Sequence, residues 1–114
     1  MSSNLASKIE RFIEEGFPSY TLRKEKYVTY FNTQLFFDFY MPEFKLLIEV
    51  QGQQHYSFNK LYHFDITDFN KQQYRDSLKT QWASENNLKL LILKFDDIEL
   101  MTKEQFKQLI ISVI

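Results

Sequence analysis

The stretch that decides the fold is QLFFDFYMPEFKLLIEVQG, residues 34–52. It holds two apolar runs of strand length, 34–40 and 45–51, and each run is interrupted by one carboxylate. The segment Met41-Pro42-Glu43 between them favours a tight turn, and Gly52 ends the second run. Two such runs joined by a short turn predict neighbouring antiparallel strands.

Further elements are predicted on both sides of this pair. Hydrophobic periodicity, turn residues and caps indicate an opening helix over 4–15, a strand over 26–31, a helix that starts near Thr67 or Asp68 and runs to 85, a strand over 88–95 and a last helix from Thr102. The strand over 88–95 is apolar almost throughout, so we expect it to be buried on both faces. Tyr74, Leu78 and Trp82 are spaced by four and are expected to face the core.

The predicted order is helix, three strands, helix, strand, helix. This order indicates an α/β fold, with a mixed sheet of about four strands flanked by helices. The third strand, the long helix and the last strand can form a crossover unit with parallel strands. The length of 114 residues predicts one domain, 1–114.

Composition excludes several classes of function. The chain has no cysteine, which rules out disulfides and thiolate metal sites and fits a cytoplasmic protein. No apolar run approaches the roughly 20 residues of a membrane span, so we expect no membrane association. The net charge of −1 argues against tight non-specific binding of DNA. Most of the 12 Phe and 7 Tyr are expected to lie in the core.

Two carboxylates stand inside apolar strands and need an explanation. Asp38 is predicted to point away from Phe37 and Phe39, and Glu49 shares a strand face with Gln51. An apolar setting is costly for a carboxylate that is neither paired nor bound to a cation. Each could instead lie on a solvated face or pair with a lysine or arginine. Two carboxylates on consecutive strands, however, favour convergence on a hard divalent cation such as Mg²⁺.

Polar residues close to Glu49 add candidates. Gln51 can hydrogen-bond an attacking water or a phosphate oxygen, although a polar residue near a strand end is an equally good description of it. His55 follows the strand that carries Glu49 and could act as a general base or acid near neutral pH. Asp76 and Lys79 lie one turn apart on the long helix, where a surface ion pair of small value is the alternative.

The segment Phe37–Phe44 followed by Ile48–Tyr56 resembles the PD-(D/E)XK nuclease superfamily, which has the restriction-endonuclease-like fold. It is most similar to the branch of very-short-patch repair and phage homing endonucleases. Members of that branch read as "DFY-P", then "IE-x-G-x-QH", then "RD-x-x-K" on a helix and an apolar strand. Arg75–Lys79 and Asn87–Leu93 match the second half, and the glutamate of Ser7–Arg11 matches the opening helix.

The resemblance implies Mg²⁺-dependent hydrolysis of phosphodiester bonds in DNA, with Mn²⁺ as a substitute. It makes Asp38 and Glu49 metal ligands, together with the Val50 carbonyl. In the branch pattern the active-site set is Glu10, Asp38, His55 and Asp76, with His55 and Asp76 handling water or proton transfer. It also implies a bacterial or phage-encoded protein. Six basic residues are candidate phosphate contacts: Arg23, Lys24, Lys26, Lys71, Arg75 and Lys79.

The chain departs from the superfamily pattern at one position of the site. The superfamily's lysine is Gln51 here, which contributes no positive charge; Lys79 or a second metal would have to compensate. Cutting both strands would need two sites, which makes a homodimer an expectation. Sequence specificity is expected to come from a separate domain or subunit, because the chain lacks the DNA-reading domains of the homing enzymes. Two other functions stay open: a non-catalytic nucleic-acid-binding module on the same fold, and a protein-interaction subunit that uses the aromatic surplus.

Overall fold

A computed structural model of the chain describes residues 4–52 and 66–114. Its elements are α1 (Asn4–Gly16), β1 (Arg23–Tyr30), β2 (Thr33–Met41), the short 3₁₀ helix η1 (Pro42–Phe44), β3 (Leu46–Gln51), α2 (Ile66–Glu85), β4 (Lys89–Lys94), α3 (Phe95–Leu100) and α4 (Lys103–Val113). The predicted order of helices and strands is confirmed. The short helix α3 was not predicted, and α2 begins before the cap expected at Thr67 or Asp68.

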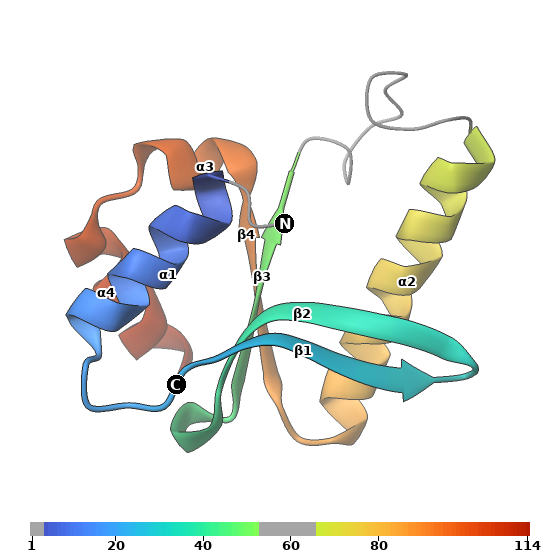
Figure 1. Cartoon of the computed structure of the whole chain (residues 1–114), viewed down its shortest axis with the longest axis horizontal. Helices are drawn as coiled ribbons and strands as arrows, with labels where there is room; N and C mark the ends of the chain where they lie inside the picture. Colours follow the sequence, from blue (N-terminus) through green and yellow to red (C-terminus); the bar gives the residue numbers. More distant parts are fainter. Residues whose placement is uncertain (1–3, 53–65) are drawn as a thin grey trace.

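The strands form a mixed four-stranded sheet in the order β1-β2-β3-β4. β1, β2 and β3 make an antiparallel meander, whereas β3 and β4 are parallel and are connected through α2. Figure 1 shows α1, α3 and α4 gathered on one side of β3 and β4, with α2 standing on the other side. The α/β fold and the crossover unit expected from the sequence are therefore confirmed.

Each face of the sheet has its own apolar cluster. The larger one packs α1, α3 and α4 against the sheet through Phe39, Met41, Leu46 and Ile48. The smaller one packs α2 against Leu35, Phe37 and Leu47. The alternation predicted for the third strand is confirmed, because neighbouring residues of β3 enter opposite clusters.

Strand β2 parts from β3 in the middle of the molecule. Their backbone pairing ends at Phe39 and Ile48, one position before Asp38 and Glu49. Phe37 packs in the α2 cluster while Phe39 packs in the other. Both rings are buried and Asp38 between them is only partly buried, so the burial along β2 is in keeping with the predicted alternation. Beyond this point the β1–β2 hairpin extends away from β3 (Figure 1). We call this opening the strand fork.

Two expectations about burial are wrong. β4 is an edge strand, and within it only Leu93 is buried while Ile92 is 41% exposed. Tyr74 is 55% exposed because α2 reaches the sheet only through its second half, where Leu78 is buried. The predicted capping box of Thr102 and Gln105 is confirmed. Over residues 4–52 and 66–114, every helix is too short or too polar to span a bilayer.

Candidate active site

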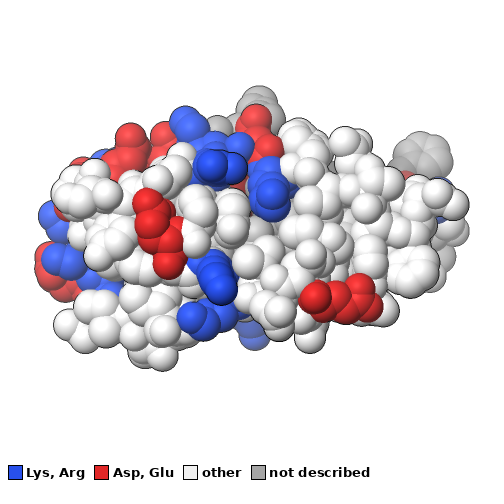
Figure 2. Space-filling view, turned by 90° about the horizontal axis from the view of Figure 1, so that it is seen from below, with Lys and Arg blue, Asp and Glu red and all other residues white. Residues whose placement is uncertain are grey.

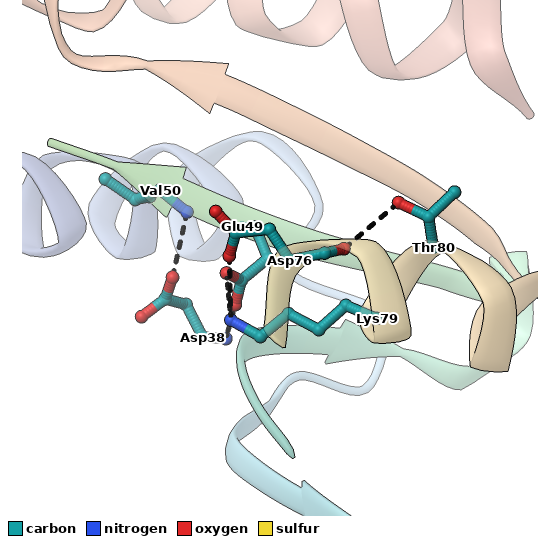
Figure 3. A network of polar contacts seen from close by, with 6 residues as sticks. All are labelled: Asp38, Glu49, Val50, Asp76, Lys79 and Thr80. Atoms are coloured by element: carbon teal, nitrogen blue, oxygen red, sulfur yellow. Dashed lines mark hydrogen bonds and ion pairs between the residues drawn. The ribbon is translucent and has the colours of Figure 1, made fainter. Parts of the chain in front are cut away.

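The strand fork is held open by the two carboxylates found in the sequence. The Asp38 N–H donates to Oε1 of Glu49 over 3.2 Å, and the Val50 N–H donates to Oδ2 of Asp38 over 2.8 Å. These reciprocal side-chain bonds occupy positions where backbone pairing of β2 and β3 would otherwise continue. Figure 3 shows both carboxylates close together at this point. The fold therefore positions Asp38 and Glu49 through the backbone of each other's strand.

Glu49 is almost fully buried and receives a cation from α2. Nζ of Lys79 lies 2.8 Å from its Oε2, and the side chains of Lys79 and Glu49 are 12% and 4% exposed. The pKa of Glu49 is raised to about 7, because burial, with a smaller contribution from the charge of Asp38, outweighs the opposing effect of Lys79. The Lys79 ammonium also lies 5.9 Å from the centre of the Phe37 ring. Glu49 is thus a carboxylate that titrates close to neutral pH.

Asp76 completes a cluster contributed by β2, β3 and α2. Its Oδ1 lies 4.0 Å from Nζ of Lys79, and the helical spacing of the two residues brings them to the same side of α2 (Figure 3). The expectation that Asp38, Glu49 and Asp76 belong to one site agrees with this arrangement. Asp76 and Lys79 were also considered as a simple ion pair on the helix surface. That alternative is incomplete, because Lys79 makes its shorter contact with buried Glu49.

Sequence reasoning missed the Lys79–Glu49 pair, although a signal for it was present. Glu49 shares its face of β3 with Leu47, and Leu47 packs in the α2 cluster. An α2 residue one position after buried Leu78 is therefore a natural partner for Glu49. Lys79 and Glu49 are 30 positions apart in the sequence, so local sequence patterns do not relate them.

The other predicted site residues have different surroundings. Gln51 is 5% exposed and lies two residues beyond Glu49 on the same face of β3. Val50 contributes its N–H to Asp38, and the ligand role expected for its carbonyl stays a prediction. Glu10 of α1 pairs with Lys24 of β1 at 3.2 Å. His55 lies outside the described residues.

The basic residues predicted to contact phosphate lie on β1 and α2. Arg23 and Lys24 are exposed at the start of β1, and Lys71 and Arg75 are exposed on α2. Lys26 is partly buried, with its ammonium 5.0 Å from the centre of the Tyr40 ring. Figure 2 shows Lys and Arg side chains near the middle of one long face, interspersed with acidic groups.

The donor set is compatible with a divalent cation that keeps much of its water. Among residues 4–52 and 66–114 no group of three or more His, Asp or Glu is arranged to hold a metal. Mg²⁺, however, is commonly bound through only one or two carboxylates, with water and substrate phosphate as its other ligands. Asp38 and Glu49 supply two such oxygens, and Lys79 shows that a positive charge is accommodated beside them.

A separate hollow of about 580 Å³ lies between β4, α3 and α4. Its lining is mainly apolar, with Asp96 and Asp97 as its acidic members, and it includes none of the site residues predicted from the sequence. The strand fork is the candidate site because of its buried charges, and this hollow contributes none of them.

Comparison with known proteins gives two partial relatives. Over 60 residues the chain is 42% identical to uncharacterized protein 307L of invertebrate iridescent virus 6, a match to 53% of the chain and 30% of that protein. Over 65 residues it is 37% identical to uncharacterized protein 033L of invertebrate iridescent virus 3. That match takes in 54% of the chain and 34% of the viral protein. The aligned stretches thus take in about a third of these relatives' length. No family model and no solved structure matches.

Proposed function

We propose that the chain hydrolyses phosphodiester bonds in DNA, with a Mg²⁺ ion held by Asp38 and Glu49. The observation that carries the proposal is the strand fork, where two carboxylates from neighbouring strands converge beside a buried lysine. Charged groups this poorly solvated are costly for a fold of this size, which favours a functional reason for them. Mn²⁺ is expected to substitute for Mg²⁺.

The metal would polarise the phosphate and supply hydroxide when bound. Asp38 and Glu49 hold its position, because each is fixed by a backbone N–H of the opposite strand. Lys79 pairs with Glu49 and would contact a phosphate oxygen bound beside this carboxylate. In this way α2 provides the positive charge that Gln51 of β3 does not.

The polar residues around Asp38 and Glu49 are proposed to activate the attacking water. We assign Gln51 to orienting the attacking water, and His55 and Asp76 to proton transfer. Glu10 has a more distant role, since its ion pair with Lys24 fixes a basic residue of β1. Val50 is a candidate ligand through its carbonyl. Arg23, Lys24, Lys26, Lys71 and Arg75 are the proposed phosphate contacts.

The element order and the mixed sheet support a restriction-endonuclease-like fold within the PD-(D/E)XK superfamily. The resemblance implied a bacterial or phage-encoded protein. Both relatives are proteins of invertebrate iridescent viruses, so we propose a viral source of that kind instead. A homodimer is proposed for cutting both strands, and a further domain or subunit is proposed for sequence specificity.

A non-catalytic DNA-binding module is the second candidate. Two observations favour it: Lys79 already balances Glu49, and the described residues hold no group of three metal ligands. Under this alternative the fork would be a structural ion pair. The experiment below separates the two candidates.

The test is cleavage of supercoiled plasmid with Mg²⁺, Mn²⁺ or EDTA. Asp38→Asn is the informative variant because it keeps the shape of the side chain, and Glu104→Gln on the exposed surface of α4 is the matched control. Metal-dependent nicking by wild type and Glu104→Gln, reduced at least a hundredfold in Asp38→Asn, is the expected result. Absence of nicking by the wild type together with retained DNA binding would select the non-catalytic alternative.

A further inference from the structure

The sheet ends at two edge strands, β1 and β4, which differ in how they are protected from pairing with a further strand. β1 begins Arg23-Lys24-Glu25-Lys26, and charged side chains of this kind discourage pairing with another chain. β4 reads Lys-Leu-Leu-Ile-Leu-Lys over 89–94, with charge only at its two ends. Among the described strands, β4 is therefore the edge better suited to pair with a partner strand.

The backbone of β4 can form hydrogen bonds along this edge. The N–H of Lys89 donates over 2.8 Å to the carbonyl of Lys45, just before β3. Because successive residues of a strand direct their backbone groups to opposite sides, Leu90 and Ile92 direct theirs away from β3. Within the described residues no strand pairs with β4 on that side. The side chain of Ile92 is exposed as well, so this edge combines backbone groups with apolar surface.

The hollow of about 580 Å³ between β4, α3 and α4 extends this surface. Leu91, Ile92 and Leu93 line it from β4, and Leu100 of α3, which is 86% exposed, lines it too. At the start of β4, Lys89 donates to the carbonyl of Ile114, whose side chain is also exposed. Exposed apolar surface next to a strand edge is typical of a contact with another protein chain.

Charge along this surface has opposite signs at its two ends. Lys89 stands at the start of β4 and shares a strand face with Leu91 and Leu93, which line the hollow. Asp96 and Asp97 follow the end of β4 and also line the hollow. In the part of the chain that the structure describes, neither aspartate forms an ion pair. In an antiparallel pair, the start of one strand lies beside the end of the other. A second copy of β4 would therefore bring a lysine to these two aspartates.

We propose that β4 and the hollow beside it bind a second copy of this chain, with the two β4 strands paired antiparallel. A register centred on Ile92 lets the two copies of this residue exchange backbone hydrogen bonds. It also places Lys94 opposite Leu90 of the second copy, so that the lysines of the two strands do not face one another. The apolar centre of each strand then covers the apolar centre of the other.

This pairing joins the two sheets into one and places both candidate sites on the same face. Glu49 is the register partner of Ile92 and lies on the next strand. With a twofold axis at Ile92, the two copies of Glu49 are three strand spacings apart, roughly 14 Å. Two sites on one face are placed to act on the two strands of one duplex. That consequence rests on the proposed function, whereas the dimer can be measured without DNA.

The test is sedimentation velocity of the full chain in EDTA over a range of concentrations. We expect a monomer–dimer equilibrium, with amide exchange at Leu90 and Ile92 slowing as the dimer forms. Leu100→Lys should weaken the dimer about tenfold or more, because it puts a lysine where Lys89 of the second copy is expected. Leu100 is exposed, so the melting temperature of the monomer should not change. Ile66→Lys, at an exposed isoleucine at the start of α2, is the matched control and should leave the dimer unchanged.

An exchange of charges tests the antiparallel arrangement separately. Lys89→Glu and Asp97→Lys should each weaken the dimer about tenfold, because each replaces an attraction by a repulsion. The double variant keeps the attraction with its signs exchanged, so it should restore the dimer. Equal weakening in the double variant and in the single variants would contradict this register.

The outcomes separate this inference from the proposed nuclease. A wild type that stays monomeric would overturn the second copy as the occupant and point to an unlike protein strand, even if the monomer nicks plasmid. A dimer that Leu100→Lys leaves intact, or that Ile66→Lys weakens equally, would also overturn the contact. A dimer that depends on Leu100 but cleaves no DNA would support the contact and contradict the nuclease. If both proposals hold, Leu100→Lys should still nick supercoiled plasmid and no longer linearise it.

Discussion

Nζ of Lys79 lies 2.8 Å from Oε2 of Glu49, and the two side chains come from α2 and β3. The pair joins the long helix to the strand fork in a region where neither charge is well solvated. Burial and Asp38 favour protonated Glu49, and Lys79 favours the carboxylate. These opposing effects make the site responsive to pH, to the loss of Lys79 and to an added cation.

The first prediction concerns pH and the free energy of unfolding in EDTA. Folding raises the pKa of Glu49 from 4.5 to about 7, so the folded state binds a proton more tightly than the unfolded state. The stability that this proton contributes is fully present below pH 4.5 and is lost as pH rises through about 7. The contribution is at most about 3 kcal/mol.

Urea unfolding of wild type and Glu49→Gln across that pH range measures this contribution. Glutamine does not titrate, so the difference between the two proteins should change with pH while other groups cancel. Parallel stability curves over pH 4.5 to 7 would contradict the raised pKa.

The second prediction concerns Lys79→Met. Removing one partner of a buried pair leaves Glu49 without compensation, so the free energy of unfolding at pH 8 should fall by about 3 kcal/mol. Adding Glu49→Gln to this variant should recover part of the loss, because no uncompensated carboxylate remains. Lys71→Met, at an exposed position on the same helix, is the control and should change stability little.

Lys79→Met should also bind Mn²⁺ more tightly than the wild type, since a competing positive charge is gone. Cleavage should nevertheless fall if Lys79 contacts the phosphate. Equal stability of Lys79→Met and wild type would show that the ion pair does not form in solution.

The third prediction concerns the attachment of the hairpin to α2. Oη of Tyr30 donates to Oε2 of Glu85 over 2.7 Å, and desolvation together with this carboxylate raises the pKa of Tyr30 to about 12. The folded-state pKa is above the usual 10.0, so this contact stabilises the fold below pH 10.0 and is lost as pH rises toward 12. Tyr30→Phe should lower the melting temperature at pH 8 and remove a tyrosine with a pKa of about 12 from an NMR titration. If the wild-type and Tyr30→Phe titrations show the same tyrosine transitions above pH 10.0, the contact is excluded.

The sequence predicted most of the fold because its local signals agree. Alternation in β3, the Pro42 turn and the Thr102 capping box each depend on neighbouring residues, and each is confirmed. The exposure of β4 was not predicted, because an apolar run does not reveal which strand lies at the edge of a sheet. The division of Phe37 and Phe39 between two clusters was not predicted for a similar reason: it depends on where β2 leaves β3.

The site was predicted in part. Asp38 and Glu49 were recognisable because charge inside apolar strands is unusual, and their mutual contacts fit that reasoning. The partnership of Glu49 with Lys79 depends on how α2 packs across the sheet, which spacing along the chain does not specify.

The most direct test of the account is calorimetric titration of Mn²⁺ into the wild type and Asp38→Asn, with Glu104→Gln as control. If Asp38 and Glu49 form the metal site, wild type and Glu104→Gln bind Mn²⁺ and Asp38→Asn binds it at least tenfold more weakly. If the wild type binds no Mn²⁺, or Asp38→Asn binds it with unchanged affinity, the strand fork is not a metal site and the proposed mechanism is wrong.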